Sequence, residues 1–164
     1  MALKPRKPMP ADVAKARLEE LCVRGERCRN ELAEKLYKWL VPQAEAARIL
    51  DDLADRRFFD DARFAAAYAR DKALFGHWGR RKIAMGLRMK RIDAAVVSEA
   101  LDSIDEDEDR SRMIDTLAAK ARSLKEGNSF EGRTKLYRFG VTHGYEPALV
   151  AAAIKSGVLF GERE

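Results

Sequence analysis

Apolar residues recur every three or four positions along most of the chain, which is the period of an amphipathic helix. One series runs from Pro10 to Gly25, and a second runs from about Cys28 to Trp39. Pro42 can open a third helix, because proline is tolerated in the first helical turn. The chain shows no sustained alternation of apolar and polar residues and no Asn-Gly or Asp-Gly hairpin signal. The pattern therefore predicts an all-α fold.

The same helical pattern occurs three times. Each copy consists of five positions, and the spacings between successive positions are four, five, five and four residues. The copies are Leu32, Leu36, Val41, Ala46 and Leu50; Ile83, Leu87, Ile92, Val97 and Leu101; and Leu136, Gly140, Tyr145, Val150 and Ile154. The first pair shares one face of a second helix, the middle residue fills the turn, and the last pair lies on a third helix.

Each copy thus predicts a three-helix unit of about 50 residues, whose core would be marginal in isolation. Stacked neighbours can bury the remaining apolar faces, as in other repeat proteins. We predict an elongated array of three tandem three-helix repeats at residues 10–57, 58–104 and 105–160. A flexible basic tail at residues 1–9 would precede them, because its prolines block a helix.

Composition narrows the class of protein. The 164 residues include 32 Lys and Arg and 27 Asp and Glu, which gives a formal net charge of +5. This modest basic excess suits a partner that carries phosphate or carboxylate. The two cysteines are too few for a disulfide framework, and neither a membrane span nor a signal peptide is recognisable. We expect a cytoplasmic protein.

The densest basic segment lies between Gly76 and Ile92, where no acidic residue occurs. Basic residues also recur on the expected second helix of the other two units, which predicts one charged stripe along the array. The candidate binding residues are Trp78, Arg80, Arg81, Lys82, Arg88, Lys90 and Arg91, together with Arg27, Arg29 and Lys35 in the first unit and Arg133, Lys135 and Arg138 in the third. Trp78 can stack on a base or enter a protein pocket. The alternative is a solvated basic face with Trp78 covering the core.

No residue pattern indicates catalysis. His77 and His143 lie far apart in the sequence, and the two cysteines lack Cys-x-x-Cys spacing. Neither a P-loop nor a Gly-x-Ser-x-Gly motif occurs. The Asp60-Asp61 pair is better explained as a helix cap than as an acid–base pair. We expect no enzyme activity, no cofactor and no metal.

Several segments resemble the RecX family. Phe58-Phe59-Asp60-Asp61 followed by Phe64-Ala65 is similar to that family's Gly-aromatic-aliphatic-Asp-Asp run before Phe-Ala. Lys90-Arg91-Ile92 resembles its Lys-Gly-Ile turn, and residues 27–36 resemble its Arg-Arg-Ser…Glu-Leu…Lys-Leu block. The likeness covers residues 10–157. Arg57 and Phe59 replace the usual Gly and aliphatic residue of the first signature, and Arg91 replaces Gly in the turn.

This resemblance implies three tandem three-helix repeats. It also implies a regulatory protein that binds RecA, lies in the groove of RecA–DNA filaments and inhibits filament extension, recombinase activity and ATPase activity. Such a protein would contribute to the control of DNA repair, DNA recombination and the SOS response. The expected partners are RecA and the RecA–DNA filament, with direct weak DNA binding left open, no membrane and a monomeric state. Composition and spacing alone leave two alternatives: a helix-turn-helix-like DNA-binding module, and a helical scaffold that binds only protein.

Overall fold

The computed structural model describes residues 2–161, and the regular secondary structure of these residues is entirely helical. The helices come in three successive groups of three. They are α1 (Ala11–Arg24), α2 (Arg29–Lys38) and α3 (Gln43–Asp55); α4 (Asp61–Leu74), α5 (Arg80–Met89) and α6 (Ala94–Asp102); and α7 (Glu106–Ser123), α8 (Phe130–Thr142) and α9 (Pro147–Lys155), with a short 3₁₀ helix at Val158–Phe160. The predicted all-α array of three tandem three-helix repeats is confirmed.

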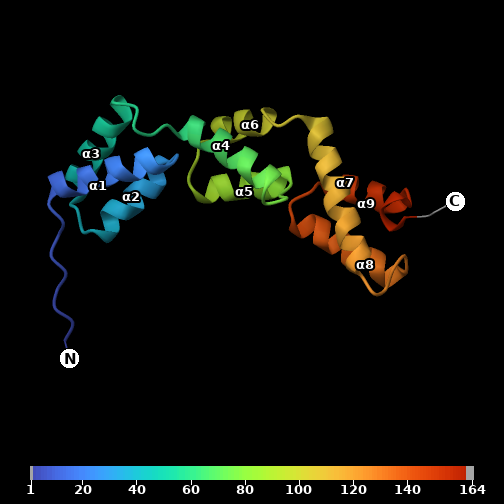
Figure 1. The fold of residues 1–164 in the computed structure, drawn as a ribbon. Helices are drawn as coiled ribbons and strands as arrows, with labels where there is room; N and C mark the ends of the chain where they lie inside the picture. The colour runs from blue at the N-terminus through green and yellow to red at the C-terminus, as the bar shows by residue number, and fades with distance from the viewer. Residues whose placement is uncertain (1, 162–164) are drawn as a thin grey trace.

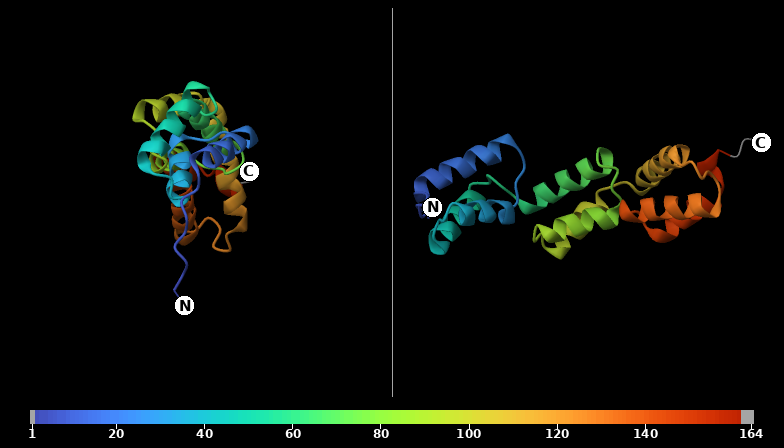
Figure 2. Two further views of the ribbon diagram at one scale, coloured as in Figure 1. Left: turned by 90° about the vertical axis from the view of Figure 1, so that its left-hand side faces the viewer. Right: turned by 90° about the horizontal axis from the view of Figure 1, so that it is seen from below.

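The repeats follow one another along an arch. Figure 1 shows the second helix of each repeat, α2, α5 and α8, on the lower side of that arch. The two further views in Figure 2 show a molecule that is long from one side and compact when seen end-on. The second helices therefore follow one edge of the molecule, which is the arrangement that a common binding stripe requires.

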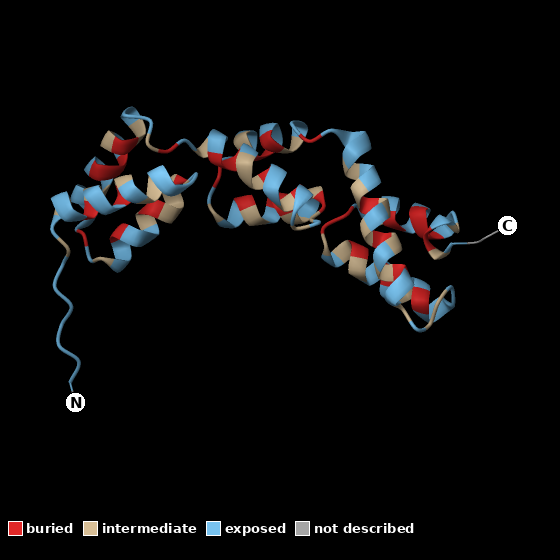
Figure 3. Ribbon diagram, viewed as in Figure 1, coloured by how far each residue is buried: buried red, intermediate tan, exposed pale blue. Residues whose placement is uncertain are grey.

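Each repeat has its own hydrophobic core. Figure 3 shows the buried residues inside each group of helices. The first core contains Leu18 and Leu36, the second contains Ile83, and the third contains Leu117 and Leu136. The cores are three separate clusters, so stacking does not merge the repeats into one continuous interior. The exact unit limits at residues 10–57, 58–104 and 105–160 remain predictions.

The five-residue offset in the sequence pattern has a backbone explanation. At the end of each second helix, a buried turn residue donates its N–H to the carbonyl oxygen of the residue five positions earlier. The pairs are Val41 to Leu36 (3.0 Å), Ile92 to Leu87 (3.1 Å) and Tyr145 to Gly140 (3.1 Å). This is the Schellman arrangement, in which the residue that follows the helix adopts a positive φ and the next residue packs back on the helix. The prediction that the third pattern residue fills the turn is confirmed.

Aspartates begin several helices. The Asp60 side chain accepts a hydrogen bond from the Arg63 N–H at 3.0 Å, which confirms the predicted cap of α4. Asp93 occupies the corresponding place before α6, but its side chain makes no capping hydrogen bond. Asp93 is therefore the N-cap residue of α6 by position alone.

Candidate binding surface and repeat junctions

The outer face of α5 carries two free arginines. Arg81 and Arg88 are seven residues apart, so they lie on one face of the helix, two turns from each other. Both are exposed, and neither forms a salt bridge with a residue that the structure describes. Met85 and Met89 lie on the same helix with 61% and 77% of their surfaces exposed. This face therefore combines charge with flexible apolar side chains, a combination suited to a macromolecular partner.

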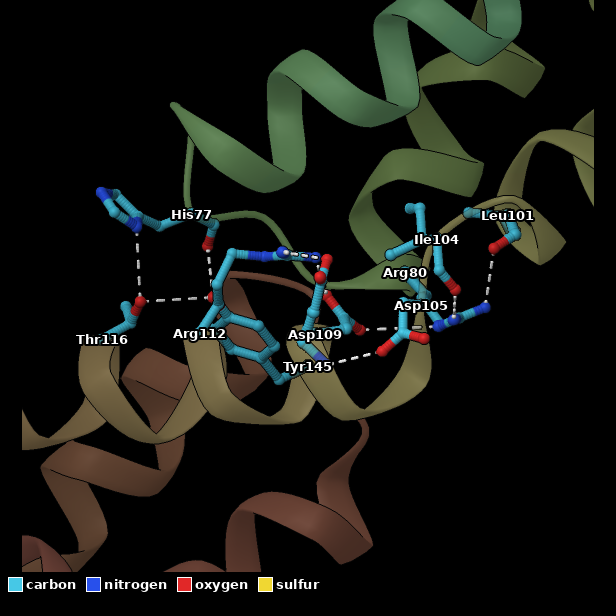
Figure 4. Close-up of polar contacts among 10 residues, drawn as sticks. His77, Arg80, Leu101, Ile104, Asp105, Asp109, Arg112, Thr116 and Tyr145 are labelled. Carbon is cyan, nitrogen blue, oxygen red and sulfur yellow. Dashed lines mark hydrogen bonds and ion pairs between the residues drawn. The ribbon is translucent and has the colours of Figure 1, made fainter.

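The Arg80 side chain, unlike that of Arg81, is bound within the molecule at the end of α6. Its guanidinium donates to the carbonyl oxygens of Leu101 (2.9 Å) and Ile104 (2.8 Å), and it lies 3.5 Å from the Asp109 carboxylate. Figure 4 shows these contacts between the end of α6 and the start of α7. Arg80 thus connects the second repeat to the third, and its charge is partly neutralised within the molecule.

The remaining predicted residues of the second repeat differ in their surroundings. Trp78 is half-buried against the second core, and the Lys82 ammonium lies 4.4 Å from its ring centre. Lys90 reaches back to the first repeat, where its nitrogen lies 3.7 Å from Glu31. Arg91 is exposed in the turn after α5 and has a φ of +56°.

In the first repeat, only one of the three predicted residues is unpaired. Arg29 lies 2.7 Å from the Asp51 carboxylate, and Arg27 lies 3.7 Å from Glu31. Lys35 is exposed on α2 and forms no salt bridge with the described residues.

In the third repeat, too, two of the three predicted residues have partners within the molecule and one is unpaired. Arg133 donates to the Asn128 side chain at 3.2 Å. Lys135 pairs with Glu126 and Glu131, and these carboxylates, Glu126 above all, raise the pKa of the Lys135 ammonium above its usual value. Arg138 is exposed on α8 and, within the part of the chain described, has no salt-bridge partner. Exposed basic residues without a salt-bridge partner among the described residues thus occur on all three second helices: Lys35 and Lys38 on α2, Arg81 and Arg88 on α5, and Arg138 on α8.

The junction between the second and third repeats is tight. The hydrogen bonds that cross it include those from the Gly79 N–H to the His143 carbonyl (2.7 Å), from the Arg81 N–H to the Gly144 carbonyl (3.1 Å) and from the Tyr145 hydroxyl to the His77 carbonyl (2.9 Å). A Cβ atom at Gly79 would overlap the backbone of Gly144, so glycine is required for this approach. Thr116 adds a contact to the His77 ring at 3.4 Å, also shown in Figure 4.

The junction between the first and second repeats is held by charged groups. The contacts are Arg63 to Glu26 (2.9 Å), Lys90 to Glu31 (3.7 Å) and the Arg29 N–H to the Asp61 carboxylate (2.8 Å). Cys28 is buried and packs into the core of the second repeat, although it precedes α2. This burial raises the pKa of its thiol to about 11.

Sequence reasoning missed the internal contacts of three arginines that it assigned to the binding surface, and it missed the junction contact of Thr116. Arg29, Arg80 and Arg133 each stand three residues before the first apolar position of their repeat, a periodicity that points to a role in the fold. Thr116 contributes to the junction through its contact with His77, and no local motif marks it. Among the described residues, no group of three or more His, Cys, Asp or Glu is placed to hold a metal ion. No helix within residues 2–161 is long and apolar enough to cross a membrane.

These features define a class of protein: a tandem array of three-helix repeats with unpaired basic residues along one edge. Residues 60–101 match the family model described as RecX, second three-helix domain. The chain is 32% identical over 142 residues to the regulatory protein RecX of Mycobacterium sp. (strain KMS), which covers 84% of this chain and 77% of that protein. It is 33% identical over 151 residues to the regulatory protein RecX of Mycolicibacterium smegmatis, with 90% and 79% covered. The chain therefore belongs to the RecX family.

Solved structures show the same fold. RecX from Lactobacillus salivarius superposes with a TM-score of 0.78 at 17% identity, over 91% of this chain and 97% of that one. A second structure, of a regulatory protein RecX, gives a TM-score of 0.79 at 20% identity, over 89% and 71% of the two chains. The relatives by sequence are named regulatory proteins, and a regulatory role follows for this chain from its family.

Proposed function

We propose that this chain binds a RecA-type recombinase and its filament on DNA, and that it inhibits filament extension and the recombinase and ATPase activities. It would thereby contribute to the control of DNA repair and recombination. Family membership supports the regulatory role, and the surface supports the kind of partner. A filament on DNA offers both protein and phosphate surfaces, which basic side chains on rigid helices can contact without reading bases.

The observation that carries this proposal is the exposed pair Arg81 and Arg88 on α5. These side chains are free of internal salt bridges within the described chain and lie beside exposed methionines. Lys35 and Arg138 are also exposed, and they belong to α2 and α8, the helices that lie with α5 on the lower side of the arch (Figure 1). We assign the contact with the filament to these four residues and Arg91, and we assign Arg80 and Lys90 mainly to the repeat junctions.

The double variant Arg81→Gln/Arg88→Gln tests the proposal. We expect the concentration that half-inhibits the DNA-dependent ATPase of RecA to rise about tenfold, which corresponds to about 1.4 kcal/mol. The loss should be largest at low salt, because contacts to a charged filament weaken as counterions are added. The measurement is a titration of the purified protein against preformed RecA filaments at two or more salt concentrations.

The matched control is Arg48→Gln/Arg122→Gln, which removes the same charge from exposed positions on α3 and α7. It should inhibit like the unchanged protein. Unaltered inhibition by the α5 variant would refute the assigned surface. Sequence-specific duplex binding without any effect on RecA would instead favour the helix-turn-helix-like module, and binding to neither would favour a protein-only scaffold.

A further inference from the structure

Three lysines near the junction of the second and third repeats are held by aromatic rings. The Lys72 and Lys82 ammonium groups lie 4.7 Å and 4.4 Å from the centre of the Trp78 ring. The Lys120 ammonium lies 5.3 Å from the centre of the Phe139 ring. An aromatic ring attracts a cation through its quadrupole but carries no net charge. These lysines are therefore positioned without being neutralised.

Several other basic residues are neutralised, wholly or in part, by partners within the molecule. Lys90 and Lys135 lie beside carboxylates, and Arg80 is bound by two carbonyl oxygens and a carboxylate. Lys72, Lys82 and Lys120 form no salt bridge with any residue in the described part of the chain. The junction thus retains unpaired positive charge close to the free arginines Arg81 and Arg88 of α5.

Two histidines, His77 and His143, lie at the same junction. The His143 ring packs on Phe139 with a centre-to-centre distance of 4.2 Å, and its Nδ1 lies 3.3 Å from the His77 carbonyl oxygen. Burial lowers the pKa of His143 most, and the charges of Lys82, His77 and Lys120 lower it further, against the opposing hydrogen bond to His77. These three charges come from α5, the loop before it and α7, so the positive groups of several elements meet around one imidazole.

We propose that Lys72, Lys82 and Lys120, together with His77 and His143, form a binding site for the phosphodiester backbone of a nucleic acid strand. The inference rests on the proposed function, since it names the DNA of the filament as the component bound at this junction. A phosphodiester fits because its negative charges recur along the strand, and the three lysines here come from three helices, α4, α5 and α7, of two repeats. A bound phosphate would also favour the protonated form of His143, so the complex takes up a proton.

The first test measures the binding of a fluorescein-labelled oligothymidylate by fluorescence anisotropy. We expect Lys82→Gln/Lys120→Gln to raise the dissociation constant about tenfold and to lower the slope of log affinity against log salt by about 1.4, or 0.7 for each lost contact with a single strand. Lys82→Arg/Lys120→Arg keeps both charges and should retain most of the affinity. Thermal unfolding of each variant shows whether the fold is preserved.

The matched control is Lys125→Gln/Lys155→Gln, which removes two exposed lysines of the third repeat outside this cluster. Its affinity should stay close to that of the unchanged protein. An equal loss in both double glutamine variants would mean that only the net charge matters, and it would overturn the site. Displacement of the oligonucleotide by polyglutamate at an equal concentration of charges would also overturn it, because the site would then accept any polyanion.

The second test uses pH. Affinity for the oligonucleotide should rise as the pH falls from 7.5 to 5.5, because protonation of His143 accompanies binding. His77→Gln/His143→Gln should remove most of this rise, which is read from the ratio of the affinities at pH 5.5 and pH 7.5 in each protein. An identical pH dependence in both proteins would exclude the histidines from the site.

RecA inhibition, measured with the same proteins, separates this inference from the proposed function. If the unchanged protein inhibits RecA but does not bind the oligonucleotide, the phosphodiester site is refuted and the regulatory function stands. If it binds the oligonucleotide through this cluster but leaves RecA active, the site stands and the proposed function fails.

Discussion

Three residues at equivalent turns share an unusual backbone conformation. Leu40, Arg91 and Gly144 each precede the buried turn residue of their repeat and have φ values of +59°, +56° and +90°. Glycine adopts this region freely, whereas a residue with a Cβ atom pays about 1–2 kcal/mol for it. The first two repeats tolerate that cost because the turn forms two backbone hydrogen bonds and buries the next side chain. The turn geometry, and not the identity of the residue, is the constant feature.

Replacing Arg91 with glycine should therefore stabilise the protein. Glycine removes the strain of about 1–2 kcal/mol but loses about 0.5–1 kcal/mol through its greater freedom in the unfolded chain. We expect the free energy of unfolding to rise by about 0.5–1 kcal/mol in urea titrations. Arg91→Ala keeps the Cβ atom and should give no such gain. Equal effects of glycine and alanine would show that the side chain of Arg91, rather than its backbone, determines the stability of this turn.

At the scale of the elements, the third repeat departs from the other two at one packing position. Gly140 on α8 takes the place that Leu36 and Leu87 occupy on α2 and α5. A Cβ atom at Gly140 would lie 2.8 Å from a methyl group of Val150 and 3.1 Å from one of Leu117. The helices α8 and α9 therefore approach so closely that Val150 fills the space of the missing side chain.

Gly140→Ala should destabilise the protein by about 1 kcal/mol. The added methyl overpacks the contact with Val150 at a cost of about 1–3 kcal/mol, which the better helix propensity of alanine offsets by about 1 kcal/mol. In combination with Val150→Ala, which removes the clashing methyls, the loss should be smaller than the sum of the two single changes. Urea unfolding of the two single variants and the double variant measures this coupling. Thr142→Ala on the exposed side of the same helix is the control and should change stability little.

The elements could be predicted closely because their signals are local. The five-residue offset from Leu36 to Val41 reflects backbone hydrogen bonds inside one turn, and the cap at Asp60 depends on residues three positions apart. The candidate binding surface was less predictable. Arg80 is bound within the molecule and Arg81 is exposed because the partners of Arg80 are Asp109 and the end of α6, about 20–30 residues away in sequence. No local pattern specifies such a contact.

At the scale of the whole molecule, the two junctions differ in the contacts that fix the angle between neighbouring repeats. Ion pairs such as Arg63 to Glu26 dominate the first junction, and exposed pairs of this kind contribute little to stability. The second junction combines the close approach of Gly79 to Gly144 with the guanidinium of Arg80. We therefore expect the angle between the second and third repeats to be more tightly defined than the angle between the first and second.

Arg80 provides the test of that difference. Arg80→Gln cannot reach the carbonyls of Leu101 and Ile104 together and removes one of the two ion-pair partners of Asp109, so we expect a loss of about 1–3 kcal/mol in the free energy of unfolding. Arg81→Gln removes the same charge one residue away, from an exposed side chain, and should stay within about 0.5 kcal/mol of the unchanged protein. Urea unfolding compares the two variants directly. Because the carbonyl contacts belong to the helix end, the difference should persist at high salt, and its disappearance in 1 M salt would show that Arg80 stabilises this junction only through its ion pair with Asp109.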